Sequence, residues 1–282
     1  MKRALVSVAA VSVLFAACAD QPEPAPLNPR DAVLDAVSAV YDAGTLHQEL
    51  DMEISTAGES FGFSAEADVD QPNQEIDMTM DLGDDLGGEM QIVMADGIVY
   101  MRAPMFQDVG TDWVSMDPEK MSPEQAARFG GFGMGTNDPS AYAGLFAGVF
   151  DVEDAGAQEI DGVPTTHYTG TIDLTRVLEN FGDVVGGEVD EATRKQLEAT
   201  IDQFEAMGVE DRIEFHLWVD DEGLPRRQRV AMDFGDLVPG DEEATLDMTV
   251  DYSAFGEAVE IEVPPASNVT DVTRLIGKMG GA

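Results

Sequence analysis

The sequence has a single cysteine among its 282 residues, at position 18. One cysteine cannot form a disulfide within the chain, so burial of apolar side chains must stabilise the fold. Histidine is also scarce, because His47, His167 and His216 are far apart in the sequence and form no H-E-x-x-H motif. A zinc site is therefore not expected.

Basic residues are few as well. The chain has 15 lysines and arginines against 56 aspartates and glutamates, which gives a formal net charge of −41. A surface with this charge repels nucleic acid and anionic lipid headgroups, so neither is expected as a direct partner.

Long apolar runs are absent after the first residues. Lys2 and Arg3 precede an uncharged stretch, Ala4–Ala17, that is typical of a secretory signal and too short to span a membrane. The run Leu14–Cys18 resembles the lipobox of bacterial lipoproteins, in which the cysteine becomes the new N-terminus and carries acyl chains. We therefore expect a signal peptide over residues 1–17, acylation of Cys18, and anchoring at the extracytoplasmic face of the cell membrane. The alternative is an ordinary cleaved signal beside an incidental cysteine.

The segment behind the cysteine is a tether. Residues 18–29 hold prolines at positions 22, 24, 26 and 29 and little that could pack. Residues 30–282 are expected to form one domain. Its first element is a helix over Asp31–Ala43, because Asn28-Pro29 supplies a cap and a first-turn proline and Gly44 ends the apolar spacing.

Alternation of apolar and polar residues dominates the rest of the chain and predicts strands with one buried face. Asp96-Gly97 and Asp161-Gly162 are strong hairpin signals. The expected strands cover residues 49–54, 61–69, 76–82, 89–95, 98–103, 112–116, 165–172, 213–220, 226–234 and 246–252, with a further one near Gln158. Consecutive strands of this kind predict an antiparallel sheet of roughly eleven strands with one covered face, an α+β fold.

Helical spacing predicts the elements that cover the sheet. Helices are expected over Pro118–Phe129, from Asp138-Pro139 to Phe150, over Asp173–Phe181 and over Asp190–Met207. The tail from Asn268 to Met279 is expected to form a last short helix.

Five short motifs, in this order along the chain, carry a resemblance to a known family: Asp96–Met101, Thr111–Asp117, Asp161–Tyr168, Leu217–Asp220 with Gly223–Pro225, and Tyr252–Gly256. Together they resemble mycobacterial LppX/LprG-type lipoproteins and, more distantly, the LolA/LolB carriers. The resemblance implies a strongly curved half-barrel with an apolar concave side closed by helices. It also implies a role in holding the acyl chains of a lipid or glycolipid in transit across the cell envelope, with an export transporter as an unidentified partner.

Methionine is frequent on the expected strands. Its flexible, polarisable side chain suits a wall that accepts varied acyl chains. The residues expected to line a ligand cavity are Met52, Phe63, Met78, Met80, Met90, Met101, Tyr142, Phe146, Phe150 and Met248. The alternative is a surface adaptor or structural lipoprotein without a cavity, in which Tyr142, Phe146 and Phe150 plug the sheet.

Catalytic signals are weak. Gly58–Gly62 matches the G-x-S-x-G pattern of serine hydrolases, but Ser60 falls between two alternating strands, where a hairpin turn is the better interpretation. An esterase that uses Ser60 is the least favoured hypothesis. We expect no catalytic residues, no metal site and no cofactor.

Overall fold

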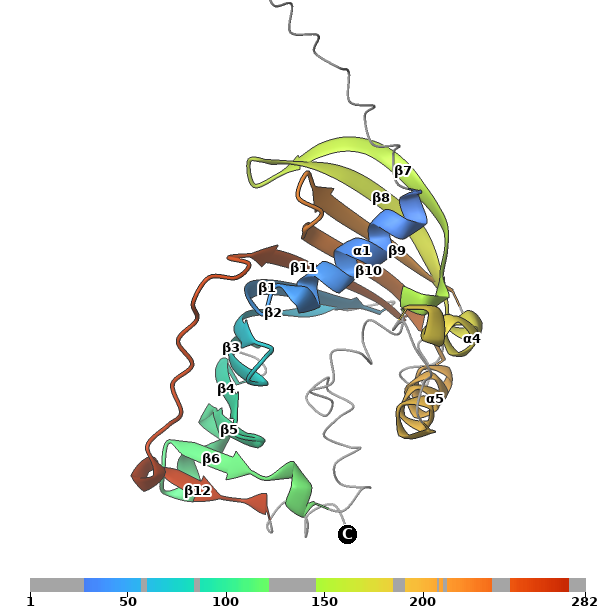
Figure 1. Ribbon diagram of the computed structural model, residues 1–282. Helices are drawn as coiled ribbons and strands as arrows, with labels where there is room; N and C mark the ends of the chain where they lie inside the picture. The colour runs from blue at the N-terminus through green and yellow to red at the C-terminus, as the bar shows by residue number, and fades with distance from the viewer. Residues whose placement is uncertain are drawn as a thin grey trace, which may run out of the picture.

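The chain folds around one sheet of twelve strands, in the order β12-β6-β5-β4-β3-β2-β1-β11-β10-β9-β8-β7. The computed structural model describes residues 28–56, 60–83, 87–121, 146–184, 191–206, 208–209, 212–234 and 244–273. Figure 1 shows the sheet curling strongly without closing. The strands are β1 (Thr45–Ser55), β2 (Ser60–Asp70), β3 (Glu75–Asp81), β4 (Glu89–Ala95), β5 (Ile98–Arg102), β6 (Trp113–Met116), β7 (Val149–Ile160), β8 (Val163–Asp173), β9 (Arg212–Asp220), β10 (Pro225–Phe234), β11 (Ala244–Ser253) and β12 (Val269–Asp271).

Neighbouring strands are antiparallel except for β12, which runs parallel to β6. Both predicted hairpins are present: Asp96 and Gly97 join β4 to β5 with φ of 53° and 74°, and Asp161 and Gly162 join β7 to β8 with φ of 48° and 84°. Positive φ at both central residues favours the Asp-Gly pair. The single, strongly curved antiparallel sheet is therefore confirmed.

The helices are few. Helix α1 (Pro29–Asp42) begins where Asn28 accepts a hydrogen bond from the Arg30 amide, and Figure 1 shows it lying across the inner face of the sheet. Helices α4 (Leu174–Val184) and α5 (Glu191–Ala206) match the two helices predicted after the second hairpin. Short 3₁₀ turns complete the set: η2 (Pro104–Val109), η3 (Pro118–Lys120), η5 (Phe146–Gly148) and η6 (Ala266–Asn268).

Two predicted helices were wrong in part. Val149 and Phe150 begin β7, because they pair with Ile172 and Thr171 of β8 and this pairing overrides their helical spacing. Residues 269–271 form β12, because their backbone finds partners along the free edge of β6. The helix expected from Pro118 begins as η3, and most of its length, like the start of the helix expected at Asp138, lies outside the described residues.

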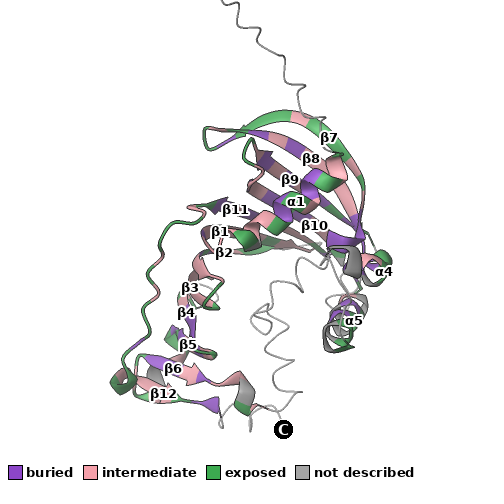
Figure 2. Cartoon of the chain, in the orientation of Figure 1, coloured by how far each residue is buried: buried purple, intermediate pink, exposed green. Residues whose placement is uncertain are grey.

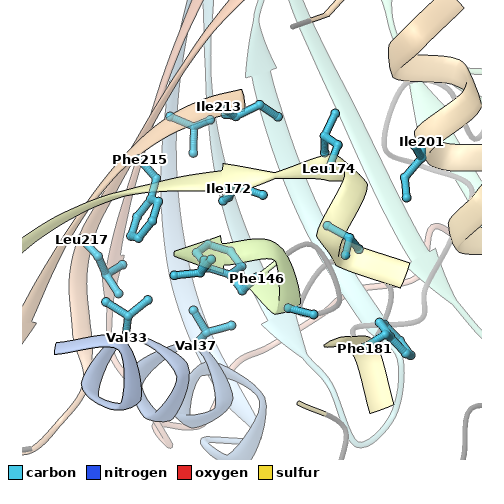
Figure 3. Close-up of a cluster of buried hydrophobic side chains, with 14 of the residues drawn as sticks. Val33, Val37, Phe146, Ile172, Leu174, Phe181, Ile201, Ile213, Phe215 and Leu217 are labelled. Carbon is cyan, nitrogen blue, oxygen red and sulfur yellow. The ribbon is translucent and has the colours of Figure 1, made fainter. Parts of the chain in front are cut away.

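Three groups of buried side chains occupy the inner face of the sheet. The first, which we call the α1 core, joins α1, η5, α4 and α5 to β8–β10, and Figure 3 shows its central residues. The second, the methionine cluster, lies over β3–β6 and β12. Its members are Ile92, Met94, Val99, Met101, Val114, Met116 and Val272, with partly buried Ile76, Met78, Met80, Met90, Phe106, Val109 and Met121 packed against them. The third and smallest lies over β1 and β11 and consists of Leu46, Val250 and Tyr252, with partly buried Val40, Leu50, Val69, Met248 and Phe255 packed against them. Figure 2 shows buried residues along α1 and along β4–β6.

Candidate functional site

Strand register places most of the predicted cavity residues on the inner face. Met52 of β1 pairs with Phe63 of β2 on one side and with Met248 of β11 on the other. On the neighbouring strands, Met80 pairs with Met90. Directly paired residues share one face of a sheet. Met80 pairs on its other side with Ala65, two residues after Phe63 on β2, so the candidate residues share one face of β11, β1, β2, β3 and β4.

The candidate side chains on β1–β4 are only partly shielded from solvent. Met52, Phe63, Met78, Met80 and Met90 are all of intermediate exposure, and Met101 is the buried member of the set at 5%. Phe61, two residues before Phe63 on β2, is 49% exposed. Sequence reasoning missed Phe61, although its alternation with Phe63 was the signal that could have found it. The methionine cluster thus has an apolar border that remains open to solvent.

The other end of the inner face is filled by the protein itself. Phe146 is 1% exposed, and its ring meets that of Phe215 edge-on at a centroid distance of 5.8 Å. Met248 packs against the same α1 core. Gly170 makes room for this packing, because a Cβ at that position would lie 2.7 Å from the Phe215 ring.

Phe150 does not join this group. Val149 points into the α1 core, so the next residue of the strand points to the outer face. There the Phe150 ring lies under two guanidinium groups, with Arg176 at 4.5 Å and Arg212 at 5.5 Å from its centroid. Tyr142 and Cys18 lie outside the described residues.

The outer face carries an open depression of about 860 Å³ over β11, β1, β2 and β3. Gly62, which lacks a side chain, lies in it, and its walls bear four carboxylates and several hydroxyl groups. The carboxylates are those of Asp51, Glu53, Asp81 and Asp247. Met52 and Phe63 also border the depression, although their side chains belong to the inner face. An acidic, hydrated surface of this kind does not suit an acyl chain.

Two histidines that are distant in the sequence meet on the outer face of β8 and β9. His167 Nε2 lies 3.0 Å from His216 Nδ1, and the His167 ring stacks parallel on Trp218 at 4.3 Å. Burial lowers the pKa of His167, and the charge of His216 lowers it further. His47 is elsewhere, with Nδ1 2.8 Å from Asp68 Oδ1. Within the described residues no three His, Cys, Asp or Glu side chains are arranged to hold a metal ion.

Ser60 begins β2, and a strand follows it. The G-x-S-x-G pattern needs a helix after its serine, so this part of the chain lacks the nucleophile geometry. Among the described helices, none combines the length and apolar character needed to span a membrane.

No family model matches the chain. A Streptomyces griseus protein, described as an uncharacterized 31.2 kDa protein in the rplA-rplJ intergenic region, is 29% identical over 132 residues, which are 47% of this chain and 38% of that protein. The match therefore spans less than half of the relative's length.

Solved structures provide the wider comparison. Lipoprotein LppX of Mycobacterium tuberculosis is 16% identical with a TM-score of 0.47, over 83% of this chain and 98% of LppX. LprF from Mycobacterium bovis is 15% identical with a TM-score of 0.47, over 84% and 97% of the two chains. A LolA superfamily protein from Nitrosomonas europaea is 8% identical with a TM-score of 0.30, over 85% and 96%. The chain is thus similar in fold to LppX and LprF and, more distantly, to a LolA superfamily protein.

Proposed function

We propose that this chain is a membrane-anchored lipoprotein that binds a lipid or glycolipid and transfers it across the cell envelope. The acyl chains lie on the inner face of β1–β4, against the methionine cluster. The observation that carries the proposal is the row of partly exposed apolar side chains on this face. Soluble proteins rarely leave such contiguous apolar surface uncovered unless it binds something.

The chemistry of the row supports an acyl chain as its ligand. Methionine side chains adapt to ligands of different shape, and each methylene group moved out of water contributes about 0.8 kcal/mol. The outer side of the same strands is acidic, with Asp77 and Asp81 alternating with Met78 and Met80. A lipid therefore has one favourable side of the sheet to bind.

The N-terminal segment supports the anchor. Acyl chains on Cys18 would hold the protein at the extracytoplasmic face of the cell membrane, despite a net charge of −41 that opposes contact with anionic lipids. Cys18→Ser should release a folded protein from the membrane fraction. If the variant stays in that fraction, the cysteine is not the anchor.

The competing function is a surface adaptor without a ligand, for which the protein must fill its own inner face. Phe146 favours that alternative in the α1 core, where it packs on Phe215. The packing of Phe146 does not fill the inner face of β1–β4, because the apolar side chains there are outside the α1 core. These are Met52, Phe63, Met78 and Met80. The adaptor therefore remains the second candidate.

The test compares two neighbouring residues on β3. Met80→Glu places a carboxylate on the inner face, and Thr79→Glu places the same charge on the outer face as a matched control. We expect native mass spectrometry of the unmodified protein to find co-purified lipid, and Met80→Glu to weaken binding of a fluorescent fatty acid at least about tenfold, since an unpaired charge against an acyl chain is costly. Thr79→Glu should bind as the unmodified protein does. Absence of lipid together with no uptake of the fatty acid would contradict the proposal.

A further inference from the structure

Three arginines from distant parts of the chain lie beside the start of β7, which is an edge strand of the sheet: Arg30 reaches it from the helix on the inner face, and Arg176 and Arg212 lie on the outer face. The Arg30 side chain of α1 donates from Nε to the carbonyl oxygen of Val149 at 3.0 Å. Arg176 of α4 and Arg212 of β9 lie over the ring of the next residue, Phe150, at 4.5 and 5.5 Å. We call Arg30, Arg176 and Arg212 the arginine patch.

The patch is unusual in a chain with 15 basic and 56 acidic residues. Three of the other described arginines pair with carboxylates: Arg226 with Asp220, Arg227 with Asp251 and Arg229 with Asp247. Arg30 and Arg212, like Arg102, form no salt bridge with a described carboxylate. Asp173 of β8 is the carboxylate nearest to Arg212 in the strand pairing, where the two residues lie directly opposite each other.

Nearby carboxylates offset part of the positive charge of the arginine patch. Arg176 is 48% exposed and lies 3.3 Å from Asp173, so its charge is partly compensated. Asp31 in the first turn of α1 and Asp151 after Phe150 add further negative charge. The start of α1 and the start of α4 both lie here, and helix N-termini contribute partial positive charge. Three arginines thus lie near three aspartates, so the patch is close to neutral within a chain that has 15 basic and 56 acidic residues.

The geometry of the guanidinium groups suits phosphate. Arg176 and Arg212 lie over the Phe150 ring, and each guanidinium held there has five N–H donors, of which only Arg176 Nε forms a salt bridge with a described carboxylate. Such N–H groups bind phosphate oxygens in pairs, as fork-shaped donors. Arg212 is exposed, so a ligand in solvent can reach it.

The location of the patch near the N-terminal tether indicates that membrane lipids are the source of that phosphate. Arg30 lies in the first turn of α1, directly after the tether. The ten residues from position 19 to position 28 span at most about 36 Å when fully extended. An anchor at Cys18 therefore keeps the start of α1 close to the bilayer. Anionic headgroups repel the acidic remainder of the surface. This repulsion favours orientations in which the arginine patch faces the bilayer.

We propose that the arginine patch contacts the phosphates of anionic membrane lipids and thereby fixes which side of the tethered domain faces the bilayer. This inference rests on the proposed anchoring at the N-terminal end. It goes beyond the lipid-carrying role, because it concerns the surface that docks on the membrane rather than the surface that holds the ligand.

The experiment tethers the protein independently of acylation. Residues 18–282 with Cys18→Ser and a hexahistidine tag before residue 18 are captured on nanodiscs that contain nickel-chelating lipid. Hydrogen exchange is then measured on nanodiscs of phosphatidylcholine alone and of phosphatidylcholine with phosphatidylglycerol. A failure of acylation in cells would leave this measurement unaffected, so failure of the anchor and failure of the patch are distinguishable.

The expected result is slower exchange at residues 28–33 and 149–154 on the anionic discs only, with the difference lost in 0.5 M NaCl. Each arginine near an anionic surface is expected to change the population of the docked orientation about fivefold. The triple variant Arg30→Gln, Arg176→Gln, Arg212→Gln should lose the protection. A control with the same charge change, Arg102→Gln, Arg194→Gln, Lys195→Gln, should keep it.

Two outcomes would overturn the proposal: equal exchange on both kinds of disc, or protection that persists in the triple glutamine variant. Exchange on phosphatidylcholine discs checks that the triple variant is folded. If that variant exchanges faster throughout the chain, the single variant Arg212→Gln replaces it, because its exposed side chain contributes little to packing. Its docked population should fall about fivefold, and an unchanged population would equally overturn the proposal.

Discussion

The division of the inner face predicts that equal truncations have unequal costs. Phe146→Ala removes a ring that is 1% exposed and packed edge-on against Phe215 at 5.8 Å. Deleting a buried phenyl ring costs about 3–5 kcal/mol, because transfer free energy is lost and a cavity remains. Met80→Ala removes a side chain of intermediate exposure at the border of the methionine cluster. Its cost should be about 1 kcal/mol, because less apolar area returns to water.

The assay is urea unfolding of protein freed of lipid, followed by the fluorescence of Trp113 and Trp218 and by circular dichroism. Removal of lipid is essential, because a ligand bound only to the folded state adds to its apparent stability. We expect the two variants to differ in free energy of unfolding by at least about 2 kcal/mol. Met80→Ala should lose affinity for a fluorescent fatty acid. Phe146→Ala, measured at a temperature at which the variant is folded, should keep its affinity. Equal losses of stability would refute the division into a packed half and an open half.

The remaining predictions concern packing, protonation and salt. Gly170→Ala should destabilise the fold by about 1–3 kcal/mol, because the added methyl group meets the Phe215 ring at 2.7 Å, and Phe215→Leu should recover part of that loss in a double-mutant cycle. Because the pKa of His167 is lowered by folding, the unfolded state binds its proton first as pH falls below about 6.5. Stability should therefore decline from pH 7 towards pH 5 by up to about 1.4 kcal/mol per pH unit from this group, and His167→Gln should flatten the decline measured by urea unfolding. The melting temperature should rise with ionic strength, because salt screens repulsion among the excess carboxylates; a flat or falling curve would contradict this reasoning.

Local patterns predicted the strands well, because alternation and turn chemistry act over a few residues. The Asp96-Gly97 and Asp161-Gly162 turns and the alternation on β1–β5 are examples, and they also placed Met52, Met78 and Met80 on a common face. Features that depend on pairing between distant segments were not predictable in the same way. The start of β7 at Val149 and the parallel pairing of β12 depend on partners elsewhere in the sheet.

The site showed the same limit. Helical spacing predicted one common face for Phe146, which fills the α1 core, and Phe150, which lies on the outer face under two arginines. The contact between His167 and His216 depends on the register of β8 against β9, and two helices lie between these strands in the chain. Arg30, Arg176 and Arg212 are brought together by three different elements, and nothing in their spacing indicates a common site.

Photo-crosslinking tests the central claim most directly. A fatty acid with a diazirine group in its acyl tail is added to the folded protein, irradiated, and located by peptide mapping. The account expects adducts on the inner face of β1–β4, at Met52, Phe63, Met78, Met80 and Met90, with competition by unlabelled fatty acid. Adducts confined to the α1 core or to the outer face, or labelling that unlabelled fatty acid does not reduce, would contradict it.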